Sequence, residues 1–468
     1  MVFRENEDLK PRIRSRPHWA GRPTRINAFS LVTLTSNILL ALAAFILGTS
    51  ALYFYLYIAI NLACLFLWFV RGQRIEDFLA LSMMFLTIYV LAPAPLNAAS
   101  HYVFWGSPEI YASLTPGPPY LCAVFLAAAS IPSLVGLPTP RAISAKQFGL
   151  NWGALFFCMV VMIGYLIVNH SLFFSSRIEL ELASVEEGFR PLAGIAMSMA
   201  PRGIGLAVFL CLLAYIVGHL TTRLPFLDIS LLALCLLVCL IYFNPLSIPR
   251  QMVMAFGLSA YYFLTWLGII SRKWLVFIIP AAALVIGPAV SNITRFELTS
   301  DFFPVSPDFD CFQNMNVGLD VLAVDGLKWG GNILASLSFF LPSELKYFND
   351  YHLLASPHFV DLLLASNISM PLPVDLYADF GTAGLIAETI LIFWYLRFAF
   401  GRVETSKTES ERIYRIGAIS VILGCWPGIM RGPLLGNAPV LLVFLIGWFL
   451  ICRFLDARRT WGLRLSKA

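Results

Sequence analysis

The chain has 468 residues, of which 59% are hydrophobic and only 13% are charged. A soluble domain carries about 25% charged residues, so this composition excludes a soluble protein with a large core and predicts an all-α polytopic membrane protein. The formal net charge of +5 does not require a nucleic-acid partner, because most of the lysine and arginine residues are predicted to gather on one side of the membrane.

The first 27 residues form a basic segment with no short apolar core and no small-residue cleavage site, so we expect a cytoplasmic segment and no signal peptide. A helix crosses the hydrocarbon core of a bilayer in about 20 residues. Twelve apolar runs are predicted to do so, at 28–48, 51–70, 77–95, 119–136, 148–168, 203–219, 224–243, 251–270, 274–291, 378–396, 412–428 and 437–455.

The basic residues set the predicted orientation, because cytoplasmic segments are enriched in lysine and arginine. With the N-terminus inside, 24 of the 32 basic residues lie on the cytoplasmic side. Both termini are therefore predicted to be cytoplasmic. The predicted divisions are a cytoplasmic segment (1–27), nine helices (28–291) with a periplasmic loop (170–202), a large periplasmic loop (292–376), three helices (377–455) and a cytoplasmic tail (456–468).

The two long outer segments are predicted to be folded. In the first, the stretch "ELELASVEEGFRPLAGIAMSM" (179–199) is typical of an amphipathic helix that lies at the membrane surface. The second, residues 292–376, contains turn signals and helical stretches. Because loops of this length without function are uncommon, we interpret it as a small helical subdomain.

Eight cations remain on the outer side, and several stand where a helix meets that face. The short turn "NPLSIPR" ends in one of them. Because arginine presents a fixed fork of donors that matches phosphate oxygens, this pattern favours a bound anionic ligand. The competing interpretation is that each arginine extends to lipid headgroups. The candidate anion-binding residues are Arg190, Arg250, Arg295 and Arg431.

Carboxylates are frequent in the large loop and at its return to the membrane: Asp301, Asp308, Asp310, Asp320, Asp325, Asp350, Asp361, Asp375 and Asp379. A carboxylate or a histidine can accept a proton from a hydroxyl group, and the candidates for this role are Asp375, Asp310 and His358. The alternative is that these are solvated loop residues or, for Asp375, a helix cap. No metal-ligand spacing or nucleotide-binding motif is present, so no cofactor is predicted.

Three stretches resemble one family. "ASLSFFLPSELKYFNDYHLLAS" and "ISMPLPVDLYADFGTAGL" resemble the large periplasmic loop of bacterial oligosaccharide repeat-unit polymerases, the O-antigen polymerase (Wzy-type) proteins, and "NPLSIPR" resembles their short arginine-ending turn. The resemblance covers roughly residues 170 to 436. Where family members often carry a basic residue after "FLP", Ser343 stands here, and Lys346 is the nearest cation.

The resemblance implies a GT-C-like, metal-independent glycosyltransferase of the bacterial inner membrane. Its substrate would be an oligosaccharide repeat unit on undecaprenyl diphosphate, and the product would be O-antigen of lipopolysaccharide, capsule or exopolysaccharide. Its partners would be membrane lipids and the chain-length co-polymerase that usually accompanies the family. Asn244, Tyr377 and Lys346 are the positions expected to contact the substrate.

Two alternatives stay open. An O-antigen ligase would use a similar scaffold and similar arginines, with a histidine base in the large loop, for which His352 and His358 are available. A polysaccharide flippase or other transporter would be expected to have internal repeats and discontinuous helices facing a midplane site. The sequence contains no clear internal repeat, and its outer ionisable residues cluster at the rim.

Overall fold

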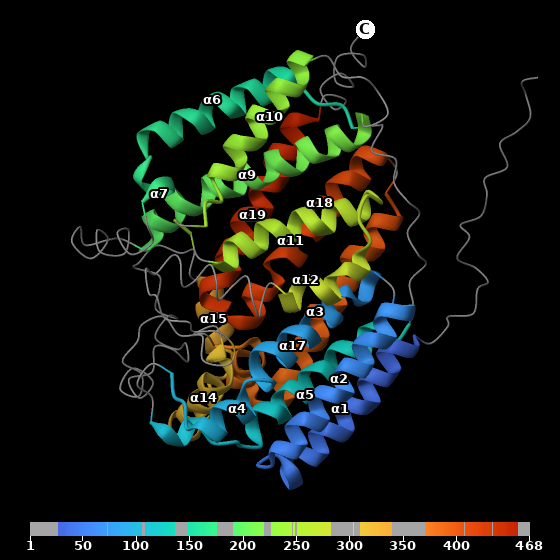
Figure 1. The fold of residues 1–468 in the computed structure, drawn as a ribbon, viewed down its shortest axis with the longest axis vertical. Coiled ribbons are helices and arrows are strands. Elements are labelled where there is room, and N and C mark those ends of the chain that lie inside the picture. Colours follow the sequence, from blue (N-terminus) through green and yellow to red (C-terminus); the bar gives the residue numbers. More distant parts are fainter. Residues whose placement is uncertain are drawn as a thin grey trace, which may run out of the picture.

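The computed structural model describes residues 27–72, 74–104, 108–135, 148–175, 191–219, 226–245, 247–248, 250–281, 303, 309–338, 370–406, 408–432 and 434–456. These residues form helices and connecting turns, with one isolated bridge between Leu150 and Asp456. The helices, labelled as in Figure 1, are α1 (Ala28–Leu47), α2 (Ala51–Arg71), α3 (Asp77–Phe85), α4 (Ala94–Ser100), α5 (Gly117–Ser130), α6 (Trp152–Val168), α7 (Ser171–Phe174), α9 (Pro191–His219), α10 (Phe226–Ile241), α11 (Arg250–Trp266), α12 (Leu275–Ala281), α14 (Cys311–Asp325), α15 (Gly331–Ser338), α17 (Leu372–Glu404), α18 (Glu409–Arg431) and α19 (Leu434–Leu455).

Polar residues placed just before the apolar runs explain where several helices begin. Asn27, Ser50 and Asn151 each accept a backbone N–H with the side chain, at the starts of α1, α2 and α6. Thr408 accepts the N–H of Glu411 over 3.1 Å at the start of α18. Such caps satisfy backbone donors that the first turn of a helix leaves without a partner.

Helix lies across all or part of each of the twelve predicted apolar runs. In the described part of the chain, seven helices are long and apolar enough to cross a membrane: Ala28–Leu47, Ala51–Arg71, Asp77–Ser100, Met199–His219, Leu372–Val403, Glu409–Arg431 and Asn437–Leu455. Shorter apolar helices cover Gly117–Ser133, Trp152–Val168 and Asp228–Ile241. The chain is therefore an all-α protein of the multi-pass membrane kind.

The helices pack in two groups joined by a central pair (Figure 1). In one group, α5 contacts α1 and α17, and α1 contacts α2. In the other group, α9 contacts α6, α10 and α19. The central pair is α11 and α18, which have the most extensive contact of any two helices in the described part of the chain, and α18 also contacts α17 and α19. This pair connects the two groups and carries part of the site described below.

Glycine allows the central pair to approach closely. A methyl group placed on Gly424 of α18 would lie 2.4 Å from the carbonyl oxygen of Ala255 and 2.7 Å from the backbone nitrogen of Ser259 on α11. Backbone contact of this kind is what small residues permit in membrane helix packing.

We therefore expect Gly424→Val to force α11 and α18 apart, at a cost of about 1–3 kcal/mol for overpacking. The matched control is Gly257→Val on α11, where an added methyl group would meet nothing within 4 Å. The measurement is the apparent melting temperature of the detergent-solubilised protein. Equal melting temperatures for the two variants would contradict the close packing.

Two sets of contacts join the ends of helices. In the first set, the start of α3 is joined to the end of α11 and the turn after it: Arg74 Nη2 donates to the Thr265 carbonyl over 2.8 Å, and Arg272 pairs with Asp77 over 2.6 Å. The other set includes the 2.8 Å hydrogen bond from Asn244 Nδ2 to the carbonyl of Phe173. Each of these contacts joins segments that the charge distribution assigns to the same side of the membrane.

Two elements differ from the sequence predictions. Residues 191–199, expected to belong to a separate helix at the membrane surface, instead extend α9, which runs continuously from Pro191 to His219. Proline is well accommodated at the first position of a helix, so the helix begins there. The predicted helix 378–396 begins earlier, at Leu372, and is interrupted near its start.

Candidate functional site

Helix α14, within the predicted large loop, is largely buried. In α14, Gln313 is 2% exposed. Its Oε1 accepts from the backbone N–H of Phe104 over 3.0 Å, and its Nε2 donates to the carbonyl of Tyr102 over 2.7 Å. A buried amide is stable only when its polar groups are paired. These two hydrogen bonds therefore fix the start of α14 to the segment between α4 and α5.

The second half of α14 is held to the same segment. Asn316 Nδ2 donates to the Tyr111 carbonyl over 3.1 Å, and Thr115 donates to Asn316 Oδ1 over 2.5 Å. The Tyr111 hydroxyl donates to Asp320 over 2.7 Å. Burial of this hydroxyl, and then its bond to the carboxylate, raise the pKa of Tyr111 to about 12, so Tyr111 remains a donor at neutral pH.

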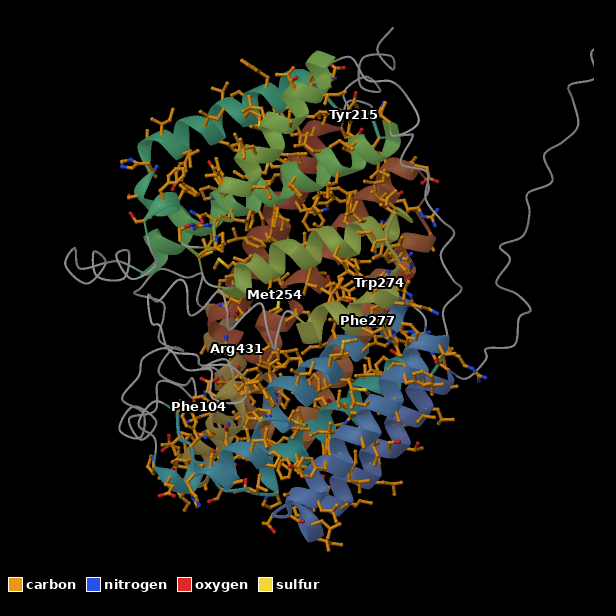
Figure 2. All side chains as sticks on the ribbon, in the orientation of Figure 1. Phe104, Tyr215, Met254, Trp274, Phe277 and Arg431 are labelled. Carbon is orange, nitrogen blue, oxygen red and sulfur yellow. The ribbon has the colours of Figure 1, made fainter. Side chains whose placement is uncertain are left out.

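A cation and a carboxylate meet just before α14. Arg431, which is labelled in Figure 2, is the last residue of α18. Its Nη2 lies 3.9 Å from Asp310 Oδ1. The Asp310 side chain is 1% exposed and that of Arg431 is 21% exposed. A buried charge of this kind is costly unless it has a partner, so the pair links α18 to the start of the large loop.

The start of α11 lies beside the end of α18. A methyl group placed on Gly428 would lie 3.9 Å from Cβ of Gln251 and 3.4 Å from Oδ1 of Asn437. Arg250, the first residue of α11, therefore lies at the same end of the helix pair as Arg431. Two arginines from segments that are far apart in sequence are thus brought to one end of the α11–α18 pair, although the side chain of Arg250 is outside those described.

Helix α17 is broken near its start. Phe380 has φ −132° and ψ 23°, and Gly381 has φ 66° and ψ −150°. The left-handed φ at this position favours glycine. The break leaves backbone carbonyls without helical partners, and the loop before α15 satisfies two of them: Lys328 N–H donates to the Ala378 carbonyl over 2.8 Å, and Trp329 N–H donates to that of Asp379 over 2.9 Å.

Two fully buried carboxylates, Asp375 and Asp379, lie in the short first part of α17. Asp379 caps α15: its Oδ1 accepts from the N–H of Asn332 over 2.8 Å, and its Oδ2 accepts from that of Ile333 over 3.0 Å. The Asn332 side chain donates to Asp375, over 3.1 Å to the carbonyl oxygen and 3.3 Å to Oδ1. The N-cap of α17 is Pro371, so Asp375 does not cap the tenth predicted helix.

Helix α14 connects the two charged regions. A methyl group placed on Gly318 of α14 would lie 3.0 Å from Val374 Cγ1, one residue before Asp375. Asp310 directly precedes α14, and α15 contacts both α17 and α19. The Arg431–Asp310 pair and the carboxylates of α17 therefore belong to one end of the bundle, which we call the polar end.

The other predicted residues are placed as follows. Asn244 binds the Phe173 carbonyl and so anchors the turn that precedes α11. Tyr377 is half-buried on α17 and packs against the core. Four of the predicted site residues lie outside the described residues: Arg190, Arg295, Lys346 and His358.

Three residues with buried polar contacts are not identified by the sequence pattern. The pattern indicates no role for Asn332, and it indicates Asp379 only as one of the carboxylates near the large loop. The available signal was the spacing of Asp375 and Asp379, which places both on one face of a helix, shortly before a glycine. Arg202, expected at the outer rim, is 2% exposed and donates to the carbonyls of Tyr242 and Leu172 over 3.2 and 3.1 Å.

No protein-family model, curated protein or solved structure matches the chain. The described helices themselves define a class, an all-α multi-pass membrane protein with arginine and buried carboxylates gathered at one end of the bundle. Among the residues that the structure describes, no group of three or more histidine, cysteine or acidic side chains is arranged to hold a metal ion.

Proposed function

We propose that the protein is a membrane-embedded polysaccharide polymerase that joins undecaprenyl-diphosphate-linked oligosaccharide repeat units on the periplasmic side of a bacterial inner membrane. The observation that carries the proposal is the polar end, where Arg431 pairs with Asp310 and the helix that begins with Arg250 lies beside it. Fixed cations beside apolar helices suit a ligand with an anionic head and a hydrocarbon tail.

The proposed reaction transfers an oligosaccharide from its lipid carrier to a hydroxyl group of a second lipid-linked repeat unit. A hydroxyl oxygen of the incoming unit attacks C1 of the donor sugar, the bond from C1 to the diphosphate oxygen breaks, and undecaprenyl diphosphate leaves with the electron pair. Arg431 and Arg250, with Arg295 and Arg190, stabilise the charge that develops on the leaving diphosphate. The proton of the attacking hydroxyl passes to a carboxylate.

Asp375 is the carboxylate that we assign as the base. Asp379 is less suited, because each of its two oxygens accepts a backbone N–H of α15. Asp310 is engaged with Arg431, and His358 is retained as an alternative base. Asn244, Tyr377 and Lys346 remain the proposed contacts to the sugars, and a chain-length co-polymerase the proposed partner.

The proposed orientation has both termini in the cytoplasm and α14 in the periplasm. A reporter that is active only in the periplasm is expected to work when fused after Asn316 and to fail when fused after Thr405. Activity of the two fusions is measured at equal membrane levels. The reverse pattern would overturn the orientation and move the polar end to the cytoplasmic face.

The proposed activity is tested by the glycolipids of cells that lack the gene. Loss of a polymerase leaves single repeat units on the lipid A core, or on the lipid carrier where the polymer is not O-antigen. Loss of a ligase leaves long chains on undecaprenyl diphosphate, which would replace the polymerase proposal with the ligase.

One observation favours a transporter as second candidate. Helix α17 is discontinuous and has carboxylates before its break, as in carriers whose broken helices line a substrate site. The break lies in the first third of a 33-residue helix, which suits the rim better than the midplane. Accumulation of lipid-linked units on the cytoplasmic face in the gene-deleted cells would favour the transporter.

A further inference from the structure

We infer that Asn332 is a positioning residue that orients the carboxylate of Asp375 for proton transfer. The inference rests on the proposed function, and it adds a residue that neither the composition nor the family resemblance indicated. Asn332 is fully buried, and its side-chain N–H groups lie within 3.1 and 3.3 Å of the carbonyl oxygen and Oδ1 of Asp375. One amide thus binds both the backbone and the carboxylate of the same residue.

This double contact fixes the direction of the carboxylate. A hydrogen bond to Oδ1 alone would leave the side chain of Asp375 free to rotate about it, whereas the second contact to the backbone sets where the amide lies relative to the helix. A buried donor facing an acceptor also favours the charged form of the carboxyl group. Asn332 therefore fixes the orientation of the Asp375 carboxylate relative to the backbone of α17.

The backbone holds Asn332 independently of its side chain. The N–H of Asn332 donates to Asp379 Oδ1 over 2.8 Å, and the neighbouring N–H of Ile333 donates to Oδ2 over 3.0 Å. The same short helix, α15, also contacts α19. A substitution of the Asn332 side chain can therefore remove the donor to Asp375 while both backbone bonds to Asp379 persist.

Most of the described charged and titratable side chains near the first part of α17 form ion pairs or hydrogen bonds with residues other than Asp375. Lys328 pairs with Asp325 over 3.2 Å, Asp310 pairs with Arg431, and Asp320 accepts from Tyr111. On α17 itself, Asp379 caps α15, and the carboxyl of Glu388 interacts electrostatically with Asp379. Among the described residues, the charged and titratable groups around the first part of α17 include Asp310, Asp320, Asp325, Lys328, Asp379, Glu388, Arg431, Tyr111 and Tyr377.

The test is Asn332→Leu, which keeps the branched shape of the side chain with a modest increase in volume and removes both N–H donors. Polymerisation is followed in membrane vesicles supplied with lipid-linked repeat units, between pH 5 and pH 9. We expect kcat to fall about tenfold to a hundredfold with KM unchanged, which is the effect of losing one hydrogen bond to a charged group. The acidic limb of the pH profile should move upward, because the charged form of the carboxyl group loses a hydrogen-bond donor.

A second variant separates positioning from folding. In the exchange Asn332→Asp with Asp375→Asn, the amide and the carboxylate trade places, so the buried hydrogen bond can re-form while the base leaves position 375. We expect membrane abundance close to wild type and no polymer. Polymer of normal length from the exchanged protein would overturn the inference, because position 375 would then need no carboxylate.

The outcomes distinguish the inference from the function on which it rests. If Asp375→Asn still makes normal polymer, the proposed base is wrong and the inference is overturned with it. If Asp375→Asn is inactive while Asn332→Leu retains the wild-type kcat and pH profile, the inference alone is overturned. A lower kcat with the displaced acidic limb, at normal abundance, supports both.

Discussion

Asp375→Asn is expected to abolish polymer formation while the protein still inserts into the membrane. The substitution keeps the shape and retains an oxygen that can accept the hydrogen bond from Asn332, so the loss is of the charge and of the proton acceptor. Removing a general base typically costs about 10²–10⁴ in rate. The measurement is the length distribution of polymer in cells that express equal amounts of each variant.

The control for this substitution is Asp325→Asn. Asp325 ends α14 and pairs with Lys328 over 3.2 Å near the surface, so the change removes an equal charge from the same subdomain without touching Asp375. We expect normal polymer from the control. Normal polymer from Asp375→Asn as well would reject the catalytic role and leave Asp375 as a structural partner of α15.

Arg431 is expected to be needed for turnover in a way that lysine cannot replace. A guanidinium presents two parallel donors to a phosphate, whereas lysine offers only a point charge. Because a hydrogen bond to a charged group contributes about 1.5–3 kcal/mol, Arg431→Lys should slow polymerisation by roughly tenfold to a hundredfold. Arg250→Lys should behave in the same way if both arginines bind one diphosphate.

A double substitution distinguishes binding of the substrate from the ion pair with Asp310. Arg431→Ala leaves the buried carboxylate of Asp310 without this cation, which should lower abundance by destabilising the fold. Adding Asp310→Asn removes that charge and should restore abundance. If Arg431 binds diphosphate, activity stays lost in the double variant; restored activity would show that the arginine serves only the fold.

Arg415 provides the matched control for Arg431. It lies on the same helix, toward the opposite end, and pairs with Glu411 over 2.5 Å. Its Nη1 also donates to the carbonyl of Arg402. An arginine whose described contacts are with its own helix and the end of the preceding helix should tolerate replacement by lysine with little effect. Equal losses from Arg415→Lys and Arg431→Lys would indicate a general need for charge on α18 and would remove the special role of the polar end.

The helical elements were largely predictable because each follows from local composition. Apolar runs of about 20 residues can satisfy their backbone groups only as helices in a bilayer, and residues such as Asn27 and Thr408 mark where those helices begin. The convergence of Arg250 and Arg431 was expected from their common side of the membrane. What the sequence left open was which helices pack together, since this depends on contacts such as that between Gly424 and Ala255.

The interior of the large loop could not be predicted in the same way. Gln313 and Asn316 have the polarity of solvent-exposed loop residues, yet both are buried. Their partners, Tyr102, Phe104, Tyr111 and Thr115, lie about 200 residues earlier. A polar side chain is buried only where a specific partner satisfies it, and no local pattern reveals a partner so far away in the sequence.

The break in α17 also has a consequence for how the polar end responds to changes in the length of the helix. In a continuous helix, each inserted residue rotates everything beyond it by about 100°. At Phe380 and Gly381 the helical path is interrupted, and the first part of α17 takes its rotational setting from α15 through Asn332. A residue inserted into or deleted from the part that crosses the bilayer would therefore rotate that part without turning Asp375 away from its neighbours.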